Sequence, residues 1–199
     1  YHHPALWGNR QSPRIYEAFA QLLGNPHLWV SVDRVSVKLP MHPDHPGWSD
    51  RNFMHWDCDP RQPAGPLRLQ GVLSLTDTPA GQGGFQCIPG AHKQAWRDTF
   101  LPRRAADWMP MHNDSTGELI GTPIPTKAGD LIIWNNLLPH GNCPNTGTAP
   151  RYAQYILMHN AKVGDTSGRQ VQVAEFHSRH KNGGFPLEPR QWEAQNSGG

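Results

Sequence analysis

Residues 67–93, LRLQGVLSLTDTPAGQGGFQCIPGAHK, give the clearest indication of the fold class in this sequence. LRLQGVLSLTD is typical of a strand, TPAGQGG of a turn, and FQCIPGAHK of a second short strand that closes on a Pro-Gly turn. No helical pattern follows the glycine-rich GQGG, so a phosphate-binding loop is disfavoured and a hairpin turn is predicted. Short strands separated by turns are typical of an antiparallel β fold.

The same pattern continues on both sides of this stretch. Three further segments read as strands: LWVSVDRVSVKLP (28–40), GDLIIWNN (129–136) and RYAQYILMHNA (151–161). A helix is predicted over residues 12–26, because Ser12 can cap it, Pro13 suits its first turn and Gly-Asn-Pro ends it. Residues 94–128 are predicted to be irregular or partly helical. We therefore predict a mainly β protein, an antiparallel sandwich or jelly roll.

Length and composition agree with that fold. The 199 residues fit one domain, so a single domain over residues 1–199 is expected, and the absence of Met at Tyr1 leaves room for a missing N-terminal segment. Twenty Gly and twenty Pro disfavour a helix bundle. The eight tryptophans are expected mainly in the core of the sandwich.

Charge and cysteine content exclude several classes of function. The net charge is +2 and the longest basic run is Arg103-Arg104, so no nucleic-acid partner is predicted. No apolar run reaches the roughly 18 residues that span a membrane. Three cysteines without a CxxC motif favour a reducing compartment, and we expect a cytoplasmic protein. The sequence leaves the oligomeric state open.

Candidate metal ligands come from a repeated His-x-Asp motif. Three copies occur: His42/Asp44, His55/Asp57 and His112/Asp114. The first and third copies lie in turn-rich segments, whereas FMHWDCDP (53–60) surrounds the second with strand residues. An extended strand would point His55 and Asp57 to one face and Trp56 to the other. Imidazole and carboxylate together suit Fe(II), Mn(II) or Zn(II); the alternative is a His-Asp hydrogen bond on a half-exposed strand.

A third ligand and an anion-binding group can come from the C-terminal half. His140 follows a buried strand and precedes Gly141, so it is a candidate ligand, or else a loop histidine at a turn. Arg151 begins an apolar strand, where a buried guanidinium would pair best with a carboxylate from a ligand or from a distant strand. Two histidines and one carboxylate on one face of a metal form the facial triad of non-haem Fe(II) oxygenases.

The order of these motifs resembles the phytanoyl-CoA dioxygenase family of Fe(II)- and 2-oxoglutarate-dependent oxygenases. The matching segments are HWD (55–57), GGFQCIPGAHK (83–93), AGDLIIWNNLLPHG (128–141) and PRYAQYI (150–156). The resemblance extends from about RVSVKLP (34–40) to Tyr155, and its most specific parts are the IPG-H-K turn and the spacing from His140 to Arg151.

The resemblance implies a double-stranded β-helix, cupin-like, with flanking helices. It implies that His55, Asp57 and His140 hold iron, and that Arg151 grips the distal carboxylate of 2-oxoglutarate. Asn142 occupies a position where the family often has a small polar contact to this cosubstrate. One departure is Val72, where the family commonly has a tryptophan near the cosubstrate.

The activity implied is hydroxylation of a small organic substrate at an unactivated C–H bond, with O2 as a cosubstrate and release of succinate and CO2. Because related halogenases replace the carboxylate ligand by a small residue, Asp57 argues against halogenation. The substrate pocket is expected among loop 41–52, loop 94–116 with Trp96 and Trp108, and the segment after His159. Three alternatives stay open: a cupin-like metal enzyme that does not use 2-oxoglutarate, a non-catalytic jelly-roll binding module, and a protein that binds 2-oxoglutarate without turnover.

Overall fold

The computed structural model describes residues 2–45, 48, 53–61, 66–101 and 120–178. It divides into two compact units, one formed by residues 1–34 with 158–199 and the other by residues 35–157. The expected single domain over residues 1–199 stays a prediction.

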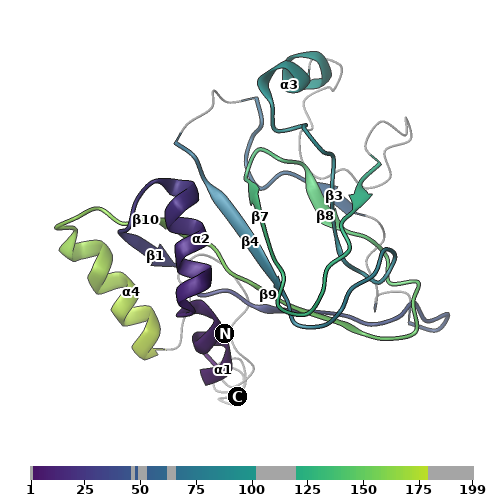
Figure 1. Ribbon diagram of the computed structural model, residues 1–199, viewed down its shortest axis with the longest axis horizontal. Helices are drawn as coiled ribbons and strands as arrows, with labels where there is room; N and C mark the ends of the chain where they lie inside the picture. The colour runs from purple at the N-terminus through teal and green to yellow at the C-terminus, as the bar shows by residue number, and fades with distance from the viewer. Residues whose placement is uncertain (1, 46–47, 49–52, 62–65, 102–119, 179–199) are drawn as a thin grey trace, which may run out of the picture. The chain divides into compact units, whose positions relative to one another are not determined.

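The unit formed by residues 35–157 contains two antiparallel four-stranded sheets, in the orders β2-β9-β4-β7 and β3-β8-β5-β6. Figure 1 shows β4 between β7 and β9, and β3 beside β8. Their bounds are β2 (Val35–Lys38), β3 (Phe53–His55), β4 (Leu69–Ser74), β5 (Phe85–Cys87), β6 (Thr122–Pro123), β7 (Leu131–Asn135), β8 (His140–Asn142) and β9 (Arg151–Tyr155). Most neighbouring strands are distant in sequence, as in a jelly roll, so the predicted fold class is confirmed.

The turn over residues 78–84 differs from the predicted hairpin. The strands that it joins, β4 and β5, belong to different sheets, so the segment crosses from one sheet to the other. Isolated bridges from Thr78 to Thr126 and from Gln82 to Asn145 hold the crossing in place. Gly83 is required there, since its φ of 71° is left-handed and a Cβ would lie 2.8 Å from the Cβ of Lys38.

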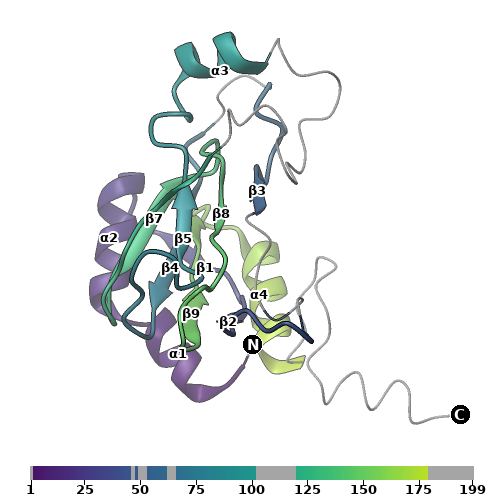
Figure 2. The ribbon, with the colours of Figure 1, turned by 90° about the vertical axis from the view of Figure 1, so that its right-hand side faces the viewer.

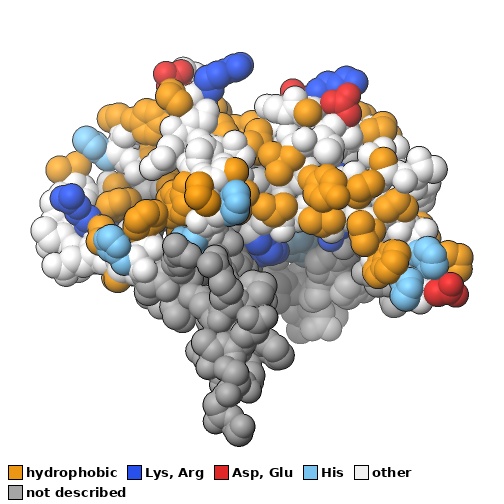
Figure 3. All heavy atoms as spheres, turned by 90° about the horizontal axis from the view of Figure 1, so that it is seen from below, with side chains coloured by type: hydrophobic (Ala, Val, Ile, Leu, Met, Phe, Trp, Pro, Cys, Tyr) orange, Lys and Arg blue, Asp and Glu red, His pale blue; other side chains and the backbone are white. Residues whose placement is uncertain are grey.

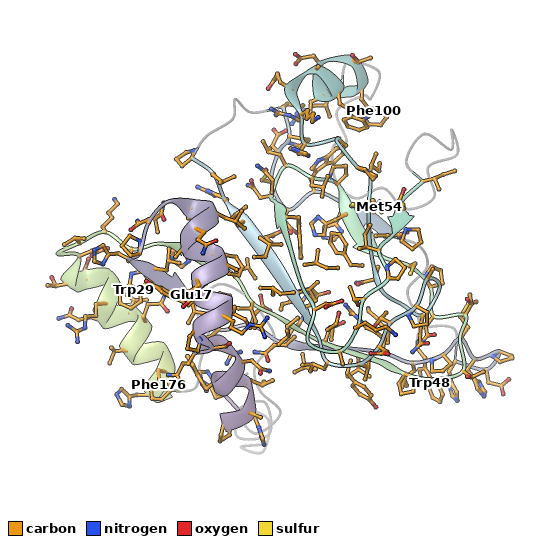
Figure 4. All side chains as sticks on the ribbon, in the orientation of Figure 1. Glu17, Trp29, Trp48, Met54, Phe100 and Phe176 are labelled. Carbon is orange, nitrogen blue, oxygen red and sulfur yellow. The ribbon has the colours of Figure 1, made fainter. Side chains whose placement is uncertain are left out.

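Side chains from both sheets form the core of this unit. One buried cluster consists of Val72, Phe85, Cys87, Trp134, Leu138 and Ala153. A second cluster contains Met54, Trp56 and Phe100, with Trp96 packed against it. Phe100 and Trp96 belong to α3 (Gln94–Phe100), and Figure 4 labels Met54 on β3 and Phe100 on α3. The second cluster therefore anchors the strand that carries His55.

The unit formed by residues 1–34 and 158–199 contains three helices and a two-stranded ladder. Their bounds are α1 (Pro4–Arg10), α2 (Pro13–Leu23), β1 (Leu28–Val30), β10 (Met158–Asn160) and α4 (Thr166–Ser178). The predicted helix is α2, which begins after Ser12 and ends at Gly24, a left-handed residue with φ 62°. The side chain of Ser12 forms no capping bond.

Two strands that the sequence predicts as continuous are interrupted. Residues 28–40 form β1 and β2, and residues 151–161 form β9 and β10, which lie in different sheets. The interruptions match, because β1 pairs with β10 whereas β2 pairs with β9. Between β1 and β2 lies Asp33, whose buried backbone carbonyl accepts a hydrogen bond of 2.5 Å from Arg10. Residues 31–34 between the two strands thus belong to neither ladder.

Among the described residues, no helix combines the length and the apolar character needed to cross a membrane. Figure 2 shows the ribbon from a second side, and Figure 3 shows one face on which Lys and Arg side chains are scattered among hydrophobic ones. The expected absence of a nucleic-acid partner stays a prediction.

Candidate metal centre

The antiparallel pair of β3 and β8 brings two of the predicted ligands together. His55 lies directly opposite His140 in the register, and the centroids of their rings are 4.5 Å apart. β3 ends at His55, so Asp57 lies in a bend and not, as the sequence predicted, on a continuing strand. The bend still turns its carboxylate toward the two imidazoles. One ligand atom from each of the three residues lies within 4.8 Å of the others.

The spacing of these atoms fits a single metal ion. The Nε2 atom of His55 is 3.2 Å from Oδ1 of Asp57, and the Nε2 atom of His140 is 3.5 Å from Oδ2 of the same carboxylate. Adjacent ligands at about 2.1 Å from a metal, at right angles, are about 3 Å apart. Two imidazole nitrogens and one carboxylate are the donor set expected for Fe(II) with open coordination positions.

The orientation of His140 is fixed by the backbone. Its Nδ1 atom lies 3.0 Å from the carbonyl oxygen of Leu138, which can only accept, so Nδ1 carries the proton and Nε2 presents a lone pair. The ring packs against Trp134 and Phe85, at centroid distances of 4.8 and 5.9 Å. Burial, with a smaller contribution from His55, lowers the pKa of His140 to about 4. His140 is therefore neutral near pH 7, as a metal ligand must be.

Asp57 is held by hydrogen bonds that favour its ionised form. Gln70 on β4 donates from Nε2 to Oδ2 at 2.5 Å, and His55 bonds Oδ1. Burial acts to raise the pKa of Asp57, but the hydrogen bonds from His55 and Gln70 outweigh it and lower the pKa to about 2. The carboxylate is thus charged and oriented before any metal binds.

The other two copies of the motif differ in their surroundings. His42 and Asp44 lie on an exposed loop, where the Nδ1 atom of His42 is 4.0 Å from a carboxylate oxygen of Asp44. His112 and Asp114 lie outside the described residues, as does Trp108 of the expected substrate pocket. Within the described residues, only His55, Asp57 and His140 form a group suited to a metal ion.

The two residues predicted to bind the cosubstrate, Arg151 and Asn142, lie on the two four-stranded sheets, one on each. Arg151 is 1% exposed at the start of β9, and its Nη1 atom donates to the hydroxyl of Ser36 on β2 at 3.2 Å. Asn142 ends β8; its Nδ2 atom is 3.5 Å from the hydroxyl of Tyr155, and its carbonyl accepts a bond from Gln86. Roles of Arg151 and Asn142 toward a cosubstrate stay predictions.

Three residues of this region escaped the sequence analysis. Gln70 is a polar residue within an apolar strand, a signal that could have marked it, whereas Ser36 looks like an ordinary residue of an alternating strand. Trp134 was counted among the core tryptophans, and it is buried. Its indole N–H, however, has no acceptor among the described residues. Val72 lies in the same cluster, on the neighbouring strand.

Comparison with known proteins identifies the family that the sequence resembles. The family model of phytanoyl-CoA dioxygenase matches residues 2–153. A Dictyostelium discoideum protein named after phytanoyl-CoA dioxygenase is 26% identical over 182 residues, covering 74% of this chain and 52% of that protein. The Ava biosynthesis cluster protein O of Aspergillus versicolor is 25% identical over 173 residues, covering 79% and 54%. The chain thus spans about half the length of the curated relatives that it matches.

Solved structures with the same fold include two proteins of nogalamycin biosynthesis. The non-heme alpha ketoglutarate dependent carbocyclase SnoK aligns with a TM-score of 0.55 at 22% identity, covering 94% of this chain and 69% of its own. The epimerase SnoN, in complex with Fe3+, alpha ketoglutarate and nogalamycin RO, aligns with a TM-score of 0.55 at 19% identity, covering 90% and 66%. These alignments confirm the predicted cupin-like jelly roll. With its family model matched over residues 2–153, the chain belongs to the phytanoyl-CoA dioxygenase family.

Proposed function

We propose that this chain carries the catalytic centre of an Fe(II)- and 2-oxoglutarate-dependent dioxygenase that hydroxylates a small organic molecule at an unactivated C–H bond. The observation that carries the proposal is the convergence of His55, Asp57 and His140 within 4.8 Å of one another in a family-matched fold. Fe(II), 2-oxoglutarate and O2, predicted from the sequence, are the cofactor and cosubstrates of that family. The epimerase SnoN holds the equivalent pair, Fe3+ and alpha ketoglutarate.

The protein's own residues prepare this chemistry by positioning. His55, Asp57 and His140 would hold the iron on one face and leave the opposite positions open to cosubstrate and O2. At the bound iron, O2 would supply the oxidising power, and 2-oxoglutarate would be consumed as the co-reductant and leave as succinate and CO2. Arg151 would bind the distal carboxylate of 2-oxoglutarate with its planar guanidinium, with Ser36 fixing one of its nitrogens. Asn142 is proposed as a smaller polar contact.

The burial of Arg151 and His140 supports these roles. Arg151 is 1% exposed and His140 is 6% exposed, so a carboxylate bound between the two sheets would face little competition from water. Asp57 is ionised by its hydrogen bonds and can balance part of the metal's charge. Because this ligand is a carboxylate and not a small residue, hydroxylation is favoured over halogenation.

An enzyme of this kind can give a hydroxylated, a cyclised or an epimerised product. Two of the structures that share this fold are of a carbocyclase and an epimerase. Product mass separates the possibilities, since hydroxylation adds one oxygen atom, ring closure removes two hydrogen atoms, and epimerisation leaves the mass unchanged. In each hydroxylation, one molecule of succinate must be released for each molecule of product formed.

The decisive experiment is an anaerobic titration of the purified protein with Fe(II) and then with 2-oxoglutarate. A visible metal-to-ligand charge-transfer band that saturates with 2-oxoglutarate is the expected result. Metal binding without this band would support the alternative, a cupin-like metal enzyme that does not use 2-oxoglutarate. No metal binding at all would indicate a jelly-roll binding module.

A further inference from the structure

Trp134 carries a buried hydrogen-bond donor that the fold itself does not use. Its side chain is 6% exposed, and its Nε1 atom has no acceptor among the described residues. Buried Trp56 shows the usual arrangement, because its indole N–H donates to the carbonyl oxygen of Leu137 at 3.0 Å. A buried donor without an acceptor is costly, so a donor that persists in a core is expected to meet a ligand.

The position of Trp134 identifies the neighbourhood in which that ligand would lie. Trp134 on β7 lies directly opposite Gln70 on β4, so both side chains project from the same face of the sheet. Gln70 hydrogen-bonds Asp57, and the indole ring lies 4.8 Å from the ring of His140. The indole ring therefore lies against one candidate iron ligand, His140, and opposite the residue that bonds a second one, Asp57.

The indole N–H of Trp134 requires a ligand that offers a hydrogen-bond acceptor. An indole N–H donates and cannot accept. 2-Oxoglutarate offers carboxylate and keto oxygens, which only accept at neutral pH. The neighbouring Gln70 behaves oppositely: its Nε2 serves Asp57, which leaves its Oε1, an acceptor, buried and without a partner among the described residues. The Oε1 atom of Gln70 thus cannot bind the cosubstrate's oxygens, because both can only accept, whereas the indole N–H of Trp134 can.

The strand register also places Trp134 away from Arg151, the residue proposed to bind the distal carboxylate of 2-oxoglutarate. Arg151 pairs with Lys38 at one end of the sheet, and Ala153, two residues further along β9, pairs with Ser74. Trp134 pairs with Gln70, four residues before Ser74 on β4. Trp134 therefore lies at the metal-ligand end of the sheet and Arg151 toward the other.

We propose that the indole N–H of Trp134 donates a hydrogen bond to a carboxylate oxygen of 2-oxoglutarate at its iron-binding end. Trp134 would thus be a cosubstrate-binding residue, complementary to Arg151 at the distal end. The inference rests on the proposed use of 2-oxoglutarate.

The test is Trp134→Phe, which removes the N–H and keeps most of the aromatic packing. In the anaerobic Fe(II) protein, we expect this variant to bind 2-oxoglutarate about tenfold to a hundredfold more weakly, as expected when a bond to a charged group is lost. Fe(II) affinity should change little. Trp56→Phe is the matched control: its N–H already has a protein acceptor, so it should lower the thermal midpoint without weakening 2-oxoglutarate binding.

A spectroscopic measurement tests the bond directly in the wild-type protein. In the Zn(II)-substituted protein, the indole N–H resonance of Trp134 should shift downfield when 2-oxoglutarate is added, and Trp134→Phe identifies that resonance by its loss. Equal dissociation constants for wild type and Trp134→Phe, or an indole resonance that does not move, would overturn the inference. If wild type itself gives no charge-transfer band, the proposed function fails instead.

Discussion

His55 and His140 lie directly opposite each other in the antiparallel pair of β3 and β8, with their ring centroids 4.5 Å apart. Two candidate ligands 85 residues apart in sequence are thus positioned by the hydrogen-bond register of a sheet. Only Asp57 lies outside a strand, and Gln70 fixes its carboxylate from the facing sheet. A site built in this way is rigid before metal arrives.

Replacing either histidine should abolish tight iron binding. His55→Ala and His140→Ala each remove one of three protein ligands, so Fe(II) affinity should fall by more than the 10- to 100-fold that is typical of losing an outer-shell partner. Anaerobic calorimetry measures the change. His42→Ala is the matched control, since His42 belongs to the same motif but lies on an exposed loop. Unchanged metal content in both site variants would refute the assignment.

Gln70→Leu should weaken metal binding without removing a ligand. The substitution deletes the hydrogen bond to Asp57, so the pKa of Asp57 should rise and its carboxylate should lose its fixed orientation. Fe(II) affinity should fall about 10- to 100-fold. The control is Gln94→Leu, which removes a similar bond to the carboxylate of Asp98 on α3. Equal iron affinities for Gln70→Leu and wild type would mean that Asp57 needs no such support.

Arg151→Lys should impair cosubstrate use while keeping the positive charge. A lysine cannot offer the two parallel N–H donors of a guanidinium, so KM for 2-oxoglutarate should rise about tenfold or more. Ser36→Ala should have a smaller effect in the same direction, because it removes only the bond to Nη1. Arg61→Lys, an exposed arginine paired with Asp59, is the control. Succinate release gives the measurement, and a KM unaffected by Arg151→Lys would exclude this residue as the distal anchor.

Much of the site could be predicted because its signals are local in sequence. The strand residues around His55 distinguished it from His42 on its exposed loop, and Gly141 marked the position of His140. Burial of Arg151 could likewise be inferred from the apolar strand that follows it. Residue type and spacing made these residues candidates, and the resemblance to the phytanoyl-CoA dioxygenase family implied their roles.

Contacts between the two sheets, and the choice of strand partners, could not be predicted from local sequence patterns. Gln70 contacts Asp57 only because β4 and β3 belong to facing sheets, and no local pattern encodes that relation. For the same reason GQGG resembled a hairpin, although it joins strands of different sheets. The interruptions after Val30 and Tyr155 depend on which strands pair, a property of the whole fold.

Gly83→Ala and Gly90→Ala should separate backbone strain from steric overlap. Both glycines have left-handed φ values, 71° and 81°, so each alanine should cost about 1–2 kcal/mol. At Gly83 the new Cβ would also lie 2.8 Å from the Cβ of Lys38, whereas nothing lies within 4 Å at Gly90. Urea denaturation should show a loss at Gly83 larger by about 1–3 kcal/mol. Equal losses would contradict the close crossing of the turn over Lys38.

The pH dependence of the metal-free protein should carry a contribution from His140. Burial lowers its pKa from 6.5 to about 4, so between these values the unfolded chain binds a proton that the folded protein does not. Lowering the pH from 7 to 4 therefore favours unfolding, by about 1.4 kcal/mol per pH unit and by roughly 3 kcal/mol in total.

His140→Gln lacks this titration, so its free energy of unfolding should approach that of wild type as the pH falls. Asp57 contributes mainly below this range, because its pKa is about 3.8 in the unfolded chain and about 2 in the folded protein. Denaturation in the presence of a chelator gives both curves, and parallel curves from pH 7 to 4 would show that His140 is accessible to protons in the folded state.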